Sequence, residues 1–270
     1  MIATMLLTLT IQKQPLIQGV DHVVVAVKDL DKAVETYQSL GFAIKSGTNH
    51  DNGIVNAHVK FPDGTEIELL SVPEQKDDLA REYKAFLEIG EGPAFASLFA
   101  PDLEAVSKKI SREHHLSSAM LTFPEGDPLR YLFFGKRQKS PTDEPKHLAH
   151  KNSAARLQRV WIAADDVRAE RNLLRSLGAQ LTDGRIDLTY TVQTSHEQIG
   201  DGEVVFFPAS FQTKKGRKIV GVTILVDDIM KTKEIFSDIF APPAQIFEHS
   251  VLVRPEETHG LWIEFRTPKS

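Results

Sequence analysis

The sequence predicts an α+β protein made of four copies of one βαβββ unit, and two observations support this fold class. First, a short apolar strand that ends in Asp and then Leu, Val or Ile, directly followed by an amphipathic helix, occurs four times. The four aspartates are Asp29, Asp102, Asp166 and Asp228. Second, a gap-free shift of 137 residues brings Asp29 onto Asp166 and Ser39-Leu40-Gly41 onto Ser176-Leu177-Gly178. A period of this length indicates one supersecondary unit that is used repeatedly.

The first copy shows the elements of the unit most clearly. Its opening strand, HVVVAVK, leads to Asp29, whose carboxylate can accept hydrogen bonds from the amides of the first helical turn. An apolar helical stripe follows in Leu30, Ala33, Val34, Tyr37 and Leu40, and Gly41 is expected to end the helix. Three strands are then expected at 42–45, 55–61 and 66–72. The last two are joined by Pro62-Asp63-Gly64, which is a hairpin signal.

The repeats also predict how the chain is divided. The four modules are expected at 19–72, 93–136, 156–209 and 217–268. Between the second and third modules, the segment 136–155 is rich in Lys, Pro, Ser and His and has no periodicity, which is typical of a linker. We therefore expect a first half at 1–140, a linker at 141–155 and a second half at 156–270. The stretch 72–92 is a second connector, in which we expect a short helix.

Charge and composition exclude several classes of function. A net charge of -5 argues against binding of nucleic acid or of an acidic membrane by bulk electrostatics, so small molecules are the expected partners. The chain has no cysteine, which excludes disulfides, thiolate metal sites and a cysteine nucleophile, and favours a reducing, cytoplasmic location. Residues 1–11 are apolar but lack a basic segment and are broken by threonines, so we expect a short strand or frayed start rather than a signal peptide. No apolar run is long enough to span a membrane, and a homodimer remains open.

Strand alternation places ionisable side chains of the first module on one face of its sheet. In the first strand, Val23, Val25 and Val27 share a face, and His22 points to the other side. The same alternation in the third and fourth strands gives a polar face made of His22, Asn56, His58, Glu66 and Glu68. No phosphate-binding glycine loop, Rossmann fingerprint, nucleophile elbow or HExxH helix occurs in the sequence. The polar face is therefore the candidate site.

A repeated βαβββ module with His on its first strand and Glu on its last resembles the vicinal oxygen chelate superfamily, which includes glyoxalases, extradiol dioxygenases, epimerases and antibiotic-binding proteins. The segments that resemble its glyoxalase-like branch are Asp21-His22-Val23-Val24-Val25-Ala26-Val27, Gly41-Phe42, His50, Asn56, Glu66-Ile67-Glu68-Leu69-Leu70 and His150-Lys151-Asn152-Ser153-Ala154. The match is strongest over 19–72. The resemblance implies that the modules pair into two cupped mixed sheets with the helices outside.

The resemblance also implies a divalent metal (Zn, Mn, Fe, Ni or Mg) held by first-strand and last-strand residues of paired modules. In the first module these residues are His22 and Glu68. The corresponding positions elsewhere are Phe95, Arg159 and Gly221 on first strands and about Leu132, Val205 and Glu264 on last strands. If modules one and four share a cup, Glu264 joins His22 and Glu68. If modules one and two share it, His50, His58, His147 or His150 would have to complete the shell, because such metals usually take at least three protein ligands.

Two functions remain open at this point. The resemblance implies a metal-dependent lyase, isomerase or dioxygenase acting on a small molecule with adjacent oxygens. Glu66 and His58 would then move protons, and His50, Asn56, His150 and Asn152 would contact the substrate. The alternative is a metal-free protein of the same fold that sequesters a small molecule or an antibiotic, with Glu68 paired to Lys60 or His22. In either case, modules three and four could serve only to scaffold or dimerise the chain.

Overall fold

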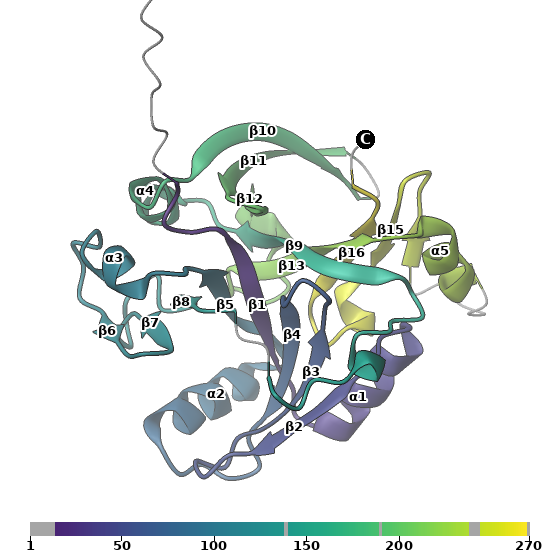
Figure 1. Cartoon of the computed structure of the whole chain (residues 1–270), viewed down its shortest axis with the longest axis horizontal. Helices are drawn as coiled ribbons and strands as arrows, with labels where there is room; N and C mark the ends of the chain where they lie inside the picture. Colours follow the sequence, from purple (N-terminus) through teal and green to yellow (C-terminus); the bar gives the residue numbers. More distant parts are fainter. Residues whose placement is uncertain (1–13, 138–139, 189–190, 238–243, 269–270) are drawn as a thin grey trace, which may run out of the picture.

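The computed structural model describes residues 14–137, 140–188, 191–237 and 244–268, and the apolar segment 1–11 lies outside them. Two mixed eight-stranded sheets dominate the described chain (Figure 1). Sheet A has the order β2-β3-β4-β1-β5-β8-β7-β6 and sheet B the order β10-β11-β12-β9-β13-β16-β15-β14. This confirms an α+β fold of paired modules. None of the helices in these residues is long and apolar enough to cross a membrane.

The bounds of the elements follow the predicted repeat, except that the strand expected at 42–45 lies at Lys45–Asn49. Sheet A consists of β1 (Gly19–Ala26), β2 (Lys45–Asn49), β3 (Val55–Lys60), β4 (Glu66–Ser71), β5 (Gly92–Phe99), β6 (His115–Leu116), β7 (Met120–Thr122) and β8 (Leu132–Gly135). Sheet B consists of β9 (Ala154–Ala163), β10 (Gln180–Asp187), β11 (Thr191–Ile199), β12 (Gly202–Phe207), β13 (Ile219–Val226), β14 (Ala244–Ile246), β15 (Ser250–Val253) and β16 (Trp262–Arg266). The α-helices are α1 (Leu30–Ser39), α2 (Asp78–Ile89), α3 (Leu103–Ser107), α4 (Arg168–Ser176) and α5 (Ile229–Ser237). Three 3-10 turns are η1 (Pro145–His147), η2 (Ala209–Phe211) and η3 (Pro255–Glu257).

Sheet pairing decides which modules share a cup. In sheet A, β1 pairs with β4 in parallel and with β5 in antiparallel orientation, so the first module is joined to the second. In sheet B, β9 makes the same two kinds of pair with β12 and β13. The strands divide between the two sheets after β8, at the segment predicted to be a linker.

Asp29, Asp102 and Asp228 cap their helices as predicted, whereas Asp166 lies one residue before Val167, the N-cap of α4. The carboxylate of Asp29 accepts from the amide of Lys32 at 3.1 Å, and that of Asp102 accepts from Ala105 at 2.9 Å. Asp166 and Asp228 each bind the amide two residues further on, at 3.0 and 2.9 Å. Each carboxylate therefore satisfies a backbone amide that has no partner inside its helix.

The apolar faces of the two sheets pack toward each other and form one continuous core. This core joins Val23 and Val25 of β1 to Val160 and Ile162 of β9. Helices α1, α3, α4 and α5 also contribute buried side chains to it, so the helices of the repeats lie outside the cups, as predicted. The core therefore belongs to both halves of the described chain.

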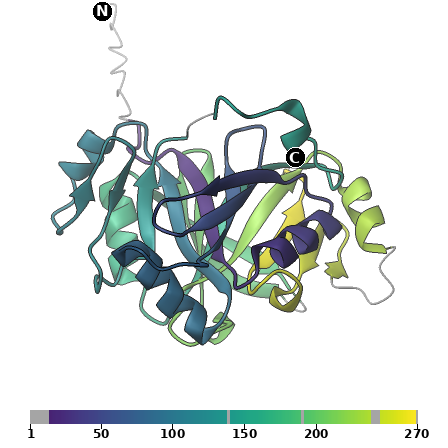
Figure 2. The same cartoon turned by 90° about the horizontal axis from the view of Figure 1, so that it is seen from below.

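The connector helix α2 lies on the opposite, concave face of sheet A (Figure 2). Its buried residues Ala80, Tyr83 and Leu87 pack against Val24 of β1 and Leu70 of β4. The expected helix in the connector is confirmed. Because α2 fills one end of the cup with apolar side chains, only the other end of the concave face remains polar.

Candidate functional site

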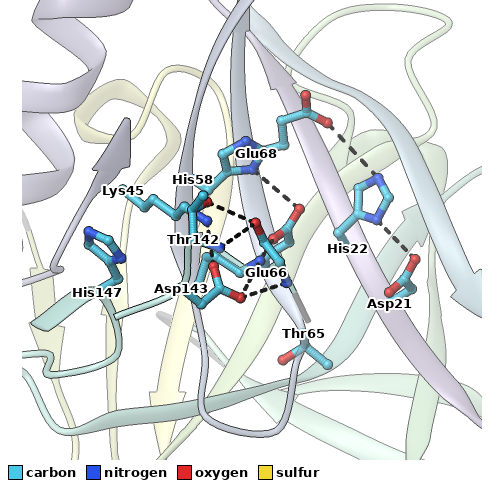
Figure 3. A network of polar contacts seen from close by, with 12 residues as sticks. Asp21, His22, Lys45, His58, Thr65, Glu66, Glu68, Thr142, Asp143 and His147 are labelled. Carbon is cyan, nitrogen blue, oxygen red and sulfur yellow. Dashed lines mark hydrogen bonds and ion pairs between the residues drawn. The ribbon is translucent and has the colours of Figure 1, made fainter. Parts of the chain in front are cut away.

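Ionisable side chains from three neighbouring strands meet on the concave face of sheet A (Figure 3). His22 comes from β1, His58 from β3, and Glu66 and Glu68 from β4. A cavity of about 540 Å³ opens beside them. Its walls include His22, His58 and Glu66, together with Asp21, Lys45, Lys60 and Phe133. Strand alternation therefore predicted correctly which of these side chains share a face.

His22 is held from both sides by carboxylates. Its Nδ1 lies 3.1 Å from Oδ2 of Asp21, and its Nε2 faces Oε2 of Glu68 at 4.0 Å. Burial lowers the pKa of His22, but the hydrogen bond and charge of Asp21, with the charges of Glu66 and Glu68, raise it to about 9. In the metal-free protein the ring is therefore an imidazolium near neutral pH.

Asp21 is a site residue that strand alternation does not reveal. A regular strand would send Asp21 to the face opposite His22. However, the pairing of β1 with β5 shifts register between Val20 and His22, as a β-bulge does. The carboxylate of Asp21 therefore reaches His22 and also accepts a hydrogen bond from Oγ of Ser97 at 2.9 Å.

Glu68 is oriented by Asn56. The side-chain amide of Asn56 donates to Oε1 of Glu68 at 2.7 Å, and its own oxygen accepts from the amide of Thr48 at 2.8 Å. Neither Glu68 nor Asn56, a predicted substrate-binding residue, lines the cavity. Asn56 reaches the site only through Glu68, which faces His22 in the cavity wall.

Glu66 forms the centre of a second set of contacts. Its two oxygens lie 3.3 Å from Nδ1 of His58 and 3.3 Å from Nζ of Lys60. Burial raises the pKa of Glu66, but the close contact with His58 and the charges of His22, His58 and Lys60 lower it to about 2. Lys60 therefore pairs with Glu66, and of the two alternatives predicted for Glu68, only the contact with His22 is present.

The segment between the two sheets supplies a further carboxylate, which no pattern in the sequence predicts at the site. Asp143 lies 2.5 Å from Nζ of Lys45 and 3.2 Å from Nζ of Lys60. His147, a predicted source of a metal ligand in the same segment, does not line the cavity, and its Nδ1 accepts from the amide of Glu144 at 3.1 Å.

Three predicted substrate contacts lie away from the cavity. His50 is exposed in the turn after β2. His150 accepts from the amide of Ala43 at 3.0 Å, and its Nε2 lies 2.9 Å from the carbonyl oxygen of Lys60. Burial lowers the pKa of His150, which agrees with a neutral ring.

Asn152 is fully buried and donates to the carbonyl oxygen of Leu40 at 2.8 Å. The structure therefore places His150 and Asn152 in the junction between the halves. There, their polar atoms already form hydrogen bonds with the backbone.

Glu264 is separated from the other predicted metal ligands. It lies on β16 of sheet B, is 2 % exposed, and accepts from Oγ1 of Thr223 at 2.7 Å. The alternative in which Glu264 joins His22 and Glu68 is therefore wrong, because modules one and two share sheet A.

In module two the last-strand residue on the cavity side is Phe133, and the predicted Leu132 is buried in the core between the sheets. Within the described ranges, no group of three or more His, Asp or Glu side chains is arranged to hold a metal.

Sheet B carries a modified copy of the same polar group. By the repeat and the strand registers, Arg159, His196 and Glu203 stand where the first half has His22, His58 and Glu66. Nε of Arg159 lies 2.8 Å from Glu203, and Nδ1 of His196 lies 2.6 Å from it. An apolar cluster that includes Trp161 and Val205, the residue in the place of Glu68, packs on this face. The second half therefore has a salt bridge and apolar packing where the first half has a cavity.

Comparisons with known proteins agree with this architecture. A family described as glyoxalase-like domain matches residues 20–178, which is more than half of the chain. No curated protein matches the sequence. Among solved structures, a mutant of 4-hydroxymandelate synthase from Streptomyces coelicolor has a TM-score of 0.62 at 13% identity, with 94% of both chains covered. A variant of homoprotocatechuate 2,3-dioxygenase from B. fuscum has a TM-score of 0.60 at 13% identity, covering 96% of this chain and 74% of that one.

A hypothetical protein from Staphylococcus aureus is also similar, with a TM-score of 0.56 at 15% identity and coverage of 93% of this chain and 99% of that one. Such low identities show the fold alone. The family match includes the strands that carry His22 and Glu68. Together with the paired βαβββ modules, it shows that this chain belongs to the glyoxalase-like domain family of the vicinal oxygen chelate superfamily.

Proposed function

We propose that this protein is an enzyme acting on a small molecule with adjacent oxygens in the cavity of sheet A, and that His22 and Glu68 hold a divalent metal there. The supporting observation is the set of contacts behind these two side chains. Asp21 binds Nδ1 of His22, which leaves Nε2 facing Glu68, and Asn56 holds the other oxygen of Glu68. Metal-binding histidines usually donate their second N–H to a carboxylate or carbonyl, and metal-binding carboxylates are hydrogen-bonded in turn.

The donor set fits an open metal site better than a closed one. Nε2 of His22 and Oε2 of Glu68 face each other at 4.0 Å, so these are the two atoms that would hold the ion. Two protein ligands leave the rest of the shell to water and substrate, as in sites that bind Mg²⁺ or Mn²⁺ through few side chains. A bound metal would polarise the adjacent oxygens of the substrate as a Lewis acid.

The other side chains of the cavity have roles that follow from their contacts. Glu66, with a pKa of about 2, stays ionised and orients the ring of His58 rather than exchanging protons itself. His58 lines the cavity and is therefore the group placed to carry a proton to or from a bound substrate. Phe133 forms an apolar wall beside His22, with its ring centre 5.2 Å from that of the imidazole.

Metal binding by purified protein tests the proposal. In calorimetric titrations with Mn²⁺, Ni²⁺ and Zn²⁺, H22A and E68Q are expected to lose nearly all affinity. D21N removes only the orienting carboxylate, and we expect it to weaken binding by about 10- to 100-fold. H249A and E248Q are matched controls, because His249 and Glu248 form an exposed pair elsewhere. The proposal fails if wild-type protein binds these metals no more tightly than H22A does.

Metal-free ligand binding is the second candidate, and two observations favour it. The described residues contain no group of three metal-binding side chains, and His22 is charged in the absence of metal, which disfavours coordination. In this case a ligand found by thermal-shift screening keeps its affinity in EDTA. Loss of ligand binding in EDTA and its recovery with added metal would support the enzyme instead.

A further inference from the structure

Two lysines next to His22 and Glu68, the proposed metal ligands, are almost fully buried, which is unusual for lysine. Lys45 on β2 and Lys60 on β3 are only 9 % and 8 % exposed, whereas lysine is rarely buried without a partner. Both line the same cavity as His22 and His58. Their ammonium groups converge on a single carboxylate, that of Asp143. Figure 3 shows Lys45 beside Asp143. Two buried ammonium groups directed at one carboxylate form a small anion-binding site.

The fold does not require these lysines. In sheet B, Thr182 occupies the place of Lys45, since Thr182 pairs with His196 as Lys45 pairs with His58. Gln198 occupies the place of Lys60 and donates to the carbonyl oxygens of Gly200 and Gly202 at 2.8 and 2.9 Å. The second half thus forms the same strands without the lysines. The lysine pair is therefore specific to the first half.

Asp143, the carboxylate between the two lysines, comes from outside sheet A. It lies in the segment between β8 and β9, whereas the other charged groups around it belong to strands of sheet A. Burial raises the pKa of Asp143, but the hydrogen bonds from Lys45 and Lys60 hold it below its usual value, so the carboxylate is an anion. Among the described residues Asp143 is the one ion-pair partner of Lys45, while Lys60 also has Glu66. Without the carboxylate of Asp143, Lys45 would lose this ion pair and Lys60 would keep only its pair with Glu66.

We propose that Lys45 and Lys60 form a subsite for an anionic group of the ligand, a carboxylate or a phosphate, and that Asp143 occupies this subsite until the ligand displaces it. The inference rests on the proposed function only in placing the ligand in this cavity, and it does not depend on the metal. A tethered carboxylate competes with free anions, so an isolated anion binds weakly to the native protein. A ligand that also contacts His22 and His58 has additional interactions with which to displace Asp143.

Anion titrations in the presence of EDTA test the subsite. Malonate and inorganic phosphate are titrated into wild type, D143N and the double variant D143N/K60M by calorimetry. D143N removes the competing charge and keeps an oxygen for the amide of Ser140, which now donates to Asp143 at 3.0 Å. We expect D143N to bind at least one of the two anions about tenfold more tightly than wild type, and D143N/K60M to lose that gain. The anion that gains affinity identifies the group as carboxylate or phosphate.

Glu144 provides the matched control, because its carboxylate lies one residue away and pairs with exposed Lys146. E144Q is expected to bind both anions as wild type does. The subsite is excluded if D143N gains affinity for neither anion, or if E144Q or D143N/K60M shows the same gain. If D143N does not fold, the melting temperatures of wild type and K60M are compared in phosphate and in malonate, at anion concentrations high enough to offset the competition from Asp143. Stabilisation of wild type alone supports the subsite, and equal stabilisation of both, or of neither, overturns it.

Failure of the anion subsite and failure of the proposed metal site can be told apart. The anion titrations contain EDTA, so they are unaffected if His22 and Glu68 bind no metal. Conversely, the effects of H22A and D21N on metal affinity do not involve Asp143 or the lysines.

Discussion

At the scale of single residues, the two halves differ in what faces the concave side of each sheet. His22 in the first half corresponds to Arg159 in the second, and Glu68 corresponds to Val205. An arginine cannot act as a metal ligand because its guanidinium stays protonated. It instead binds Glu203 at 2.8 Å and gives sheet B a structural ion pair. The same backbone therefore carries a candidate site in one half and a stabilising contact in the other.

The ion pairs of Glu203 predict a specific dependence of stability on pH. Burial raises the pKa of Glu203, but hydrogen bonds from His196 and Arg159 lower it from 4.5 to about 2. Glu203 therefore stabilises the fold fully above its unfolded pKa, and this contribution is lost as the pH falls toward 2. We expect E203Q to lower the free energy of unfolding by about 3 kcal/mol at pH 7, and this difference to shrink by about 2 kcal/mol at pH 3.

Urea denaturation of wild type and E203Q at the two pH values measures this difference. E248Q is the control, since Glu248 is exposed and is expected to show no such dependence. A stability difference between wild type and E203Q that is the same at pH 3 and pH 7 would contradict the assigned role.

At the scale of elements, α2 determines how much of the cup in sheet A remains open. The helix belongs to no repeat, and its buried side chains cover the apolar end of the concave face. Its N-terminus is fixed by Asp77, whose carboxylate accepts from the amide of Ala80 at 2.7 Å. The remaining polar end holds the cavity. A connector that appears incidental in the sequence thus sets one boundary of the candidate site.

Truncation of a buried residue of α2 is expected to destabilise the protein through packing. Leu87 is 6 % exposed and belongs to the apolar cluster on the concave face. L87A should therefore lower the free energy of unfolding by about 2 to 4 kcal/mol, since it removes apolar contacts and leaves a cavity. I89A is the matched control, because Ile89 lies on the same helix and is 65 % exposed. Equal effects of the two substitutions in chemical denaturation would show that α2 does not pack as described.

At the scale of the whole molecule, the two halves are joined by buried polar contacts as well as by a common core. Tyr37 of α1 donates to the carbonyl oxygen of Thr258 at 3.3 Å, which links module one to module four. Fully buried Glu170 of α4 accepts from Oη of Tyr131 at 2.8 Å and pairs with Lys218 at 2.6 Å. Module two is thereby linked to module three. The second half therefore has a structural role even if it binds no ligand.

Separation of the halves tests this role. A fragment of residues 1–140 would expose the apolar face that packs against sheet B and would lose the partners of Tyr37 and Tyr131. We expect this fragment to lack a cooperative thermal transition in circular dichroism, while the full chain unfolds in a single transition. A fragment that unfolds cooperatively and still binds the ligand of the full chain would show that the second half is dispensable.

The sequence by itself determined the features that depend on local periodicity. The recurring Asp and the apolar alternation predicted four modules, their helix caps, and the shared face of His22, His58, Glu66 and Glu68, because these follow from residues close together in the chain. Only the tertiary structure decided which modules pair, and this separated Glu264 from His22. It also placed His150 and Asn152 in the junction and brought Asp143 to the lysines. These contacts join segments far apart in sequence, and neither a bulge nor an aperiodic connector has a pattern from which its partner can be predicted.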